Sequence, residues 1–320
     1  MKANTTAAER LIELANESLS VSSHAVAIWH IPGFYYDKEG HQTAKRLMEA
    51  DAQSAFATAT AYRLTGESVY ADKAAELIDG WSSVNVGFAD NDGPLVSAYL
   101  GTGLILAAQR IHHYEGWSAE RRDRFIQWIT TVCLPAWDGI PGRNNWWSWS
   151  LYAQLCAYRF INDSDAIQSE TIHLKTHIDE SLDLSGFIPE ETVRGTNGMW
   201  YHYFSLAPLT AAAKIVLEET GEDLFRWVSP SGKSLKKALD TLLYYIDDRA
   251  DEWPFEKDQN VPKPLSAHTW PLDMYEGLTH LYGDPAYERF VAPHRPVASH
   301  INANSGYFQS YAWCFPELDK

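Results

Sequence analysis

Residues 65–70 read TGESVY, and this stretch decides the fold because related stretches recur as TGEDLF at 220–225 and YGDPAY at 282–287. In each of the three, a glycine is followed by an acidic residue and, four positions after the glycine, by an aromatic residue. Glycine readily adopts the left-handed conformation that ends a helix, and an acidic side chain can cap the helix that follows. The sequence therefore predicts helices joined by tight turns, with an aromatic side chain packed into each corner.

The segments around these turns have helical periodicity. Apolar residues recur at steps of three and four, whereas the alternation typical of strands is scarce. We expect an all-α chain with helices over about 43–64, 68–82, 94–114, 118–133, 146–161, 165–182, 199–219, 232–248, 267–282 and 285–291. Such stacked helical hairpins form either an (α/α) toroid or incomplete barrel, or an open solenoid.

The longer connections are the places where we expect function, since binding and catalytic residues concentrate on loops held by a rigid scaffold. They cover residues 29–42, 84–93, 137–145, 184–198 and 250–266. No change in composition marks a second domain, so we expect one domain over residues 1–320.

Composition limits the classes of partner. The net charge of −16 disfavours nucleic acid, whose binders usually present a basic face. Apolar stretches are much shorter than the roughly 20 residues of a membrane helix, which predicts a soluble protein. The first residues, MKANTTAAERLI, lack the apolar core of a secretion signal, so we expect either a cytoplasmic protein or one whose signal has been removed. Cys133, Cys156 and Cys314 have no paired spacing, and we expect buried free thiols.

Tryptophan is unusually abundant, and this favours a carbohydrate ligand. Trp146, Trp147 and Trp149 cluster, while Trp253 and Trp270 lie in expected loops. Flat aromatic faces stack against sugar rings, although packing in the core is the ordinary role of a single tryptophan.

No motif in the sequence indicates a metal or cofactor. His173 and His177 have a spacing that could ligate zinc, but they lie in a polar, acidic helix without an evident third ligand. We expect that helix face to be solvated. Phosphate loops and dinucleotide-binding glycine patterns are absent from the sequence.

Residues 188–209, IPEETVRGTNGMWYHYFSLAPL, carry the strongest signal for chemistry. They place Arg194 and Tyr201 seven positions apart, where a glycine-containing loop enters an apolar helix. The unperturbed pKa of tyrosine is about 10, and a guanidinium about 4 Å away favours the phenolate by roughly 4 kcal/mol at an effective dielectric constant near 20. Such a tyrosine could take and return a proton near neutral pH. The alternative is a half-buried aromatic residue beside a charge that flanks the helix.

A second candidate stretch is GRNNWWSWS, residues 142–150. Asn144 and Asn145 precede an aromatic-rich helix, so their amides lie near a helix N-terminus, which favours a carboxylate ligand. Arg143 is their neighbour in sequence. The alternative role for such an asparagine is that of an ordinary N-cap.

These motifs together resemble those of the alginate lyase superfamily of (α/α)-toroid polysaccharide lyases. The resemblance rests on Arg194, Gly195, Tyr201 and His202 followed by Leu206, Pro208 and Leu209, and on the paired asparagines before an aromatic helix. Residues 31–74 are also similar to the N-terminal helices of that family. The likeness covers most of residues 30–220 and is weaker beyond them.

The resemblance implies a cofactor-independent β-elimination in a uronic acid polymer such as alginate, polymannuronate or glucuronan. A residue at the position of Tyr201 is then the proton-transfer group, with Arg194 assisting it. Asn145 is the candidate that neutralises the substrate carboxylate, which makes the neighbouring proton acidic enough to remove. The implied partner is an acidic polysaccharide.

One position departs from the family pattern. The best-known alginate lyases have a histidine directly after the two asparagines, and this chain has Trp146. Tyr201 could act as base and then acid in a syn elimination. Alternatively, Tyr201 is only the acid, and the base is one of the histidines His41, His202 and His268. A third possibility is that the site binds polymer without cleaving it.

The remaining substrate-binding candidates flank the motifs. His202 follows Tyr201 but points about 100° around a regular helix, which makes it a neighbour or a substrate contact. Tyr36 and Lys38, in the expected loop before the first strong helix, could form part of a cleft wall, and Trp146 could shape the subsite.

A glycoside hydrolase on an (α/α) barrel is the competing enzyme class. It would need two carboxylates facing a cleft, and the expected loops supply Asp90, Asp92, Glu190 and Glu191. A non-catalytic sugar-binding module is the third class.

Overall fold

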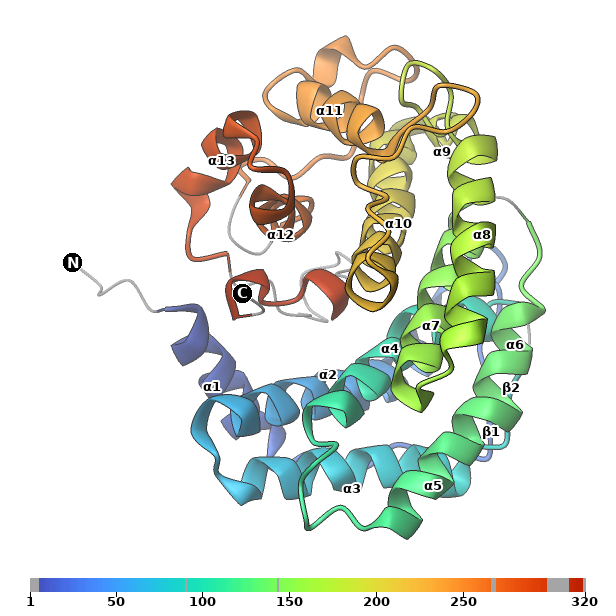
Figure 1. The fold of residues 1–320 in the computed structure, drawn as a ribbon, viewed down its shortest axis with the longest axis vertical. Coiled ribbons are helices and arrows are strands. Elements are labelled where there is room, and N and C mark those ends of the chain that lie inside the picture. The colour runs from blue at the N-terminus through green and yellow to red at the C-terminus, as the bar shows by residue number, and fades with distance from the viewer. Residues whose placement is uncertain (1–5, 90, 143, 266–268, 298–310, 319–320) are drawn as a thin grey trace. The chain divides into compact units, whose positions relative to one another are not determined.

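The structure is a computed structural model that describes residues 6–89, 91–142, 144–265, 269–297 and 311–318. Helices dominate these residues (Figure 1), and the strands among them are one parallel pair, β1 (Ile28–His30) and β2 (Gly87–Ala89). The predicted all-α fold class is therefore confirmed. Within the described residues, none of the helices is long and apolar enough to cross a membrane.

The chain divides into two compact units. Among the described residues, the first comprises those within 6–140 and 160–162, and the second comprises those within 141–159, 163–297 and 311–318. Each unit is described by itself below, and the expectation of one domain over residues 1–320 stays a prediction.

The first unit is built around a long helix, α2. Its neighbours in Figure 1 are α1, α3 and α4, and α2 packs against all three of them. The small buried side chains of Ala52, Ala55 and Ala59 are among those that allow this close approach. The helices of this unit are α1 (Ala7–Ser18), α2 (Lys38–Thr65), α3 (Ser68–Val84), α4 (Gly93–Arg110), α5 (Ala119–Trp128), a π-helical turn (Ile129–Cys133) and α6 (Leu134–Asp138).

Helix α2 begins five residues earlier than the apolar pattern predicted. The side chain of Asp37 accepts a hydrogen bond from the Gly40 amide at 2.8 Å and so caps a polar first turn. Periodicity alone misses such a turn because its side chains are largely exposed. Helix α1 was also missed, although Thr6 and Glu9 form a complete capping box at its start.

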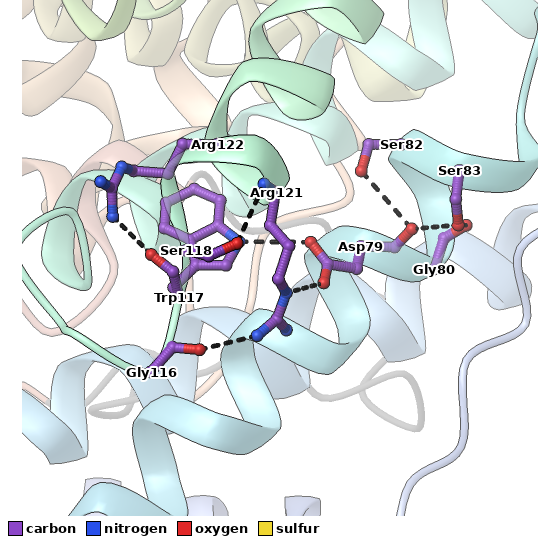
Figure 2. Close-up of polar contacts among 9 residues, drawn as sticks. All are labelled: Asp79, Gly80, Ser82, Ser83, Gly116, Trp117, Ser118, Arg121 and Arg122. Carbon is purple, nitrogen blue, oxygen red and sulfur yellow. Dashed lines mark hydrogen bonds and ion pairs between the residues drawn. The ribbon is translucent and has the colours of Figure 1, made fainter.

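A polar cluster joins α3 to α5 (Figure 2). The carboxylate of Asp79 accepts hydrogen bonds from the Arg121 guanidinium and, at 3.2 Å, from the indole N–H of Trp117. Ser118 caps α5 by accepting from the Arg121 amide. Both ends of this link are partly buried, which favours a fixed position of α5 on α3.

The second unit is organised around α10 (Gly198–Thr220), drawn in yellow in Figure 1 between α8 and α11. Sixteen of its residues are buried, and it packs against α8, α9 and α11. The other helices of this unit are α7 (Asn145–Ile161, with its last two residues grouped in the first unit), α8 (Ser164–Ser181), α9 (Pro189–Thr192), α11 (Leu235–Ile246), α12 (Leu272–Tyr282) and α13 (Pro285–Val291). Short 3-10 turns cover Gly195–Asn197, Ala250–Glu252, Ala292–His294, Tyr311–Trp313 and Pro316–Leu318.

The three glycine turns behave as predicted at their helix ends. Gly66, Gly221 and Gly283 terminate α2, α10 and α12 in the left-handed conformation, with φ of 77°, 76° and 62°. The aromatic residues four positions later, Tyr70, Phe225 and Tyr287, are all buried.

The acidic residues of these turns differ in role. Asp284 caps α13 through the Ala286 amide at 2.8 Å, whereas Glu67 makes no side-chain cap to α3. After Gly221 the chain does not enter a helix at once, because α11 begins only at Leu235. As predicted, none of the three cysteines forms a disulfide, and all three are buried.

Candidate active site

Both predicted motifs lie in the second unit, at the starts of α7 and α10. Helix α7 begins at Asn145, and the side-chain oxygen of the preceding Asn144 accepts a hydrogen bond from the Trp146 amide at 3.1 Å. Asn144, which is half-buried, therefore acts as a local cap of the helix. This placement brings the Asn145 side chain to a helix N-terminus, as the sequence predicted.

Asn145 is held by a buried carboxylate. Its backbone N–H and its side-chain Nδ2 both donate to Oε1 of Glu191, at 2.6 Å and 2.8 Å. Asn145 is 1% exposed and Glu191 is 0% exposed, so this pairing is shielded from water. It fixes the orientation of the Asn145 amide from a residue 46 positions further along the chain.

Glu191 also connects the asparagine to the arginine loop. Its backbone carbonyl accepts a hydrogen bond from the Arg194 amide at 3.1 Å. Burial raises the pKa of the Glu191 carboxyl, while the two Asn145 hydrogen bonds and the positive charge of Arg194 offset part of this effect. The Asn145 motif and the Arg194 motif thus meet at one residue.

Arg194 and Tyr201 are brought together as predicted. The Arg194 guanidinium carbon lies 4.4 Å from the centroid of the Tyr201 ring, a cation–π arrangement. Both side chains are half-buried. Trp200 lies edge-on to Tyr201 with the ring centroids 4.8 Å apart, and it stacks on Phe204 one turn along α10.

Two glycines shape the connection between Arg194 and Tyr201. Gly195 has φ of +60°, which a side chain would strain. Gly198, at the start of α10, packs so closely on α9 that an added Cβ would lie 2.6 Å from the Thr192 carbonyl oxygen. The chain therefore turns sharply after Arg194 and returns at Tyr201, one turn into α10.

His202 lies in the core. It is 0% exposed, and its ring packs near Phe187 and Trp253, at centroid distances of 6.3 Å and 6.2 Å. Burial lowers the pKa of His202 to about 4, against a smaller raising effect of the Ala238 backbone and Asp183. A contact with substrate would require an exposed imidazole, and the structure does not expose it.

The tryptophans separate into two groups. Trp149, Trp253 and Trp270 are fully buried and belong to the core. Trp146 and Trp147, beside Asn145, are half-buried and keep part of their surface accessible. Arg143, His268 and Asp90, which the sequence also suggested as site or carboxylate candidates, lie outside the described residues.

Three other candidates belong to the first unit. Tyr36 is 87% exposed, and Lys38 begins α2 with its Nζ 5.6 Å from the Phe34 ring. His41 is buried, with its Nδ1 2.9 Å from the Pro32 carbonyl oxygen and 3.2 Å from a carboxylate oxygen of Asp92. A role of Tyr36 and Lys38 in substrate binding stays a prediction.

The expectation of a solvated face at His177 is wrong. Its ring is fully buried, and its Nε2 lies 2.8 Å from the Ser148 hydroxyl, which also contacts the Ser205 hydroxyl at 2.8 Å. His177 also packs against Trp147 of α7. The polar sequence of α8 does not indicate this contact, because the partner residue lies on another helix. Within the part of the chain that the structure describes, no group of three or more His, Cys, Asp or Glu side chains could hold a metal ion.

From the sequence, Glu191 was only one of four loop carboxylates available to a hydrolase. The structure shows that its Oε1 accepts from Asn145 in a buried position. The sequence shows an acidic residue shortly before Arg194. Its burial could not be detected from periodicity, because α9 has only four residues.

Comparison with solved structures identifies the fold. An alginate lyase from Bacteroides ovatus is 16% identical, covers 93% of this chain and 90% of its own, and has a TM-score of 0.76. Alginate lyase A1-III from Sphingomonas species A1 is 14% identical, with coverage of 88% and 90% and a TM-score of 0.71. A histidine-to-alanine variant of A1-III complexed with a tetrasaccharide is 15% identical, with coverage of 83% and 79% and a TM-score of 0.71.

Because these identities are low, the likeness shows the fold alone. This fold is the one that the sequence predicted, that of (α/α)-toroid lyases. A comparison with curated proteins gave no match. The sequence profile of the alginate lyase family, however, matches residues 6–253, which include α7, the Arg194 loop and α10. With most of its length matched and its two motifs joined through Glu191, this chain belongs to the alginate lyase family.

Proposed function

We propose that this protein is a polysaccharide lyase that cleaves a uronic acid polymer, alginate, polymannuronate or glucuronan, by β-elimination. The observation that carries the proposal is the Arg194 guanidinium 4.4 Å from the centre of the Tyr201 ring, in a chain of the alginate lyase family. A cation at this position favours the phenolate over the neutral phenol, because it stabilises the negative charge. Tyr201 then has the chemistry of a general base.

In the proposed reaction Tyr201 takes the proton from the carbon that bears the substrate carboxylate. The electron pair of that C–H bond forms a carbon–carbon double bond, and the glycosidic C–O bond on the next carbon breaks. The leaving oxygen keeps the bonding pair and receives the proton back from the Tyr201 hydroxyl. One residue on one face of the sugar thus serves as base and acid in a syn elimination.

Asn145 is proposed to neutralise the substrate carboxylate. One N–H of its amide is committed to Glu191, so the second N–H of Nδ2 is the donor available for a carboxylate oxygen. Fixing the amide in advance saves the cost of orienting it during the reaction. Since Asn145 is 1% exposed, its use also requires the neighbouring side chains to give access to the substrate.

Trp146 occupies the position after the paired asparagines and is half-buried. Its indole N–H donates but does not accept a proton, so Trp146 is proposed as a wall of the sugar subsite. The buried environment of His202 argues against this imidazole as the base, and we assign proton transfer to Tyr201.

The test is incubation with polymannuronate, polyguluronate and glucuronan while both ultraviolet absorbance and reducing ends are followed. A lyase raises both signals, because elimination creates a conjugated double bond. A hydrolase raises only reducing ends, and a binding protein raises neither. Absence of the ultraviolet signal on every uronic polymer would refute the proposed function.

Two variants then separate the proposed roles. Arg194→Met should lower kcat, because the proposed phenolate loses its stabilising charge. Asn145→Ala should lower kcat by about 10²-fold or more. Asn144→Ala is the matched control, and it should mainly destabilise the start of α7, by about 1 kcal/mol.

A further inference from the structure

The turn between Arg194 and Tyr201 is held by a segment about 60 residues downstream, in the connection between the Ala250–Glu252 turn and α12. Gln259 makes three hydrogen bonds there. Its Nε2 donates to the Gly195 carbonyl at 2.9 Å and to the Glu256 carbonyl at 2.7 Å, and its Oε1 accepts from the Met199 amide at 2.7 Å. A single side chain therefore contacts both ends of the turn.

The next residue, Asn260, holds the middle of the turn. Its backbone N–H donates to the Thr196 carbonyl at 2.8 Å. Its side-chain Nδ2 donates to Oδ1 of Asn197 at 2.9 Å and lies 3.3 Å from the Thr196 hydroxyl. Gln259 and Asn260 together are called the brace below.

The brace adds side-chain hydrogen bonds to a turn whose own bonds are backbone ones, from the Asn197 amide to the Arg194 carbonyl at 3.3 Å and from the Gly198 amide to the Gly195 carbonyl. Gly195, Thr196 and Asn197 are all exposed, and Gly195 has a left-handed backbone. Helix α10 also lacks a local side-chain cap, since Asn197 makes no capping hydrogen bond. The first amides of a helix have no partner within it, and Gln259 supplies the acceptor for that of Met199.

We infer that Gln259 and Asn260 are positioning residues of the site proposed above, which hold the Arg194 guanidinium over the Tyr201 ring. Arg194 precedes the braced turn directly, and Tyr201 lies two residues after Met199. The hydrogen bonds at Gly195, Thr196, Asn197 and Met199 fix the turn. The distance between Arg194 and Tyr201 therefore has little freedom to change. The inference rests on the proposed function, because it assigns the brace to the same reaction.

The matched variants are Gln259→Met and Gln259→Glu. Methionine keeps the length of the side chain and removes all three hydrogen bonds. Glutamate keeps the acceptor for the Met199 amide but loses both donors, so it holds α10 and releases Gly195. Asp258→Ala, at an exposed neighbouring position, is the control.

The first readout is hydrogen exchange at the Met199 amide, which does not depend on catalysis. Exchange should accelerate at least tenfold in Gln259→Met and stay near the wild-type rate in Gln259→Glu and Asp258→Ala. Unchanged exchange in Gln259→Met would show that the side chain does not hold the turn, and would overturn the inference even for a protein without lyase activity.

The second readout is the elimination rate. Both Gln259 variants should lower kcat by about ten- to a hundredfold, with KM changed less than about threefold, because a displacement of 1 Å at reacting groups costs rate rather than binding. Wild-type kcat in a Gln259→Met protein whose Met199 amide exchanges rapidly would overturn the positioning role. Absence of activity in the wild-type protein would instead refute the proposed function.

Discussion

His202 should make the stability of this protein fall between pH 8 and pH 5. The imidazole is completely buried next to Phe187 and Trp253, and burial lowers its pKa to about 4 from 6.5. The unfolded chain therefore binds a proton at a pH where the folded chain does not. Stability rises with pH wherever the unfolded state binds more protons, so this contribution is complete above about pH 6.5 and is lost progressively as the pH falls from there to about 4.

The magnitude follows from the two pKa values. A depression of this size corresponds to about 3 kcal/mol in total, of which about 2 kcal/mol is already lost at pH 5. His202→Phe keeps an aromatic ring in the same cluster and removes the titration. Any cost of fitting the phenyl ring is the same at both pH values, so the difference between them isolates the imidazole.

The assay is urea unfolding of the wild-type protein and the variant at pH 8 and pH 5. Wild type should lose about 2 kcal/mol more than His202→Phe between the two conditions. His280→Phe, which removes an exposed histidine, is the control and should retain the wild-type loss. Equal losses in wild type and His202→Phe would refute the reasoning that His202 is buried and neutral.

Two further predictions concern the residues that join the motifs. Burial raises the pKa of the Glu191 carboxyl, so the folded state binds more protons than the unfolded state and stability is lost as the pH rises through that raised pKa. Glu191→Gln should therefore gain stability relative to wild type between pH 4.5 and pH 8 in urea unfolding, and a difference that does not change with pH would contradict this. Gly198→Ala places a Cβ 2.6 Å from the Thr192 carbonyl oxygen and should cost about 1–3 kcal/mol, measured by the same unfolding assay. Gly195→Ala, where open space surrounds the added Cβ but φ is +60°, should cost about 1 kcal/mol, and a loss at position 198 no larger than this would argue against the tight contact.

The turns and most helices were predictable because their causes are local in sequence. Gly66, Gly221 and Gly283 stop helices through their own backbone conformation, whatever the rest of the chain does. Arg194 and Tyr201 were predictable as a pair for the same reason, since both lie at one loop–helix junction.

The supporting contacts of the site were not predictable, because each joins distant parts of the chain. Glu191 reaches Asn145 across 46 residues, and Gln259 reaches Met199 across 60. The burial of His202 in the core was not predictable either, because the aromatic residues around it come from other parts of the chain. Its neighbour Tyr201 is half-buried on α10, but the adjacent helix position faces the cluster formed by Phe187 and Trp253.

The central claim is that the Tyr201 hydroxyl transfers the proton in a β-elimination. The most direct test is the rate of unsaturated product formation by Tyr201→Phe on the uronic polymer that wild type cleaves fastest, with polymer affinity measured alongside. The account predicts a loss in kcat of about 10²- to 10⁴-fold with affinity nearly unchanged, because only the hydroxyl is removed. A Tyr201→Phe protein that forms unsaturated product at the wild-type rate would contradict it.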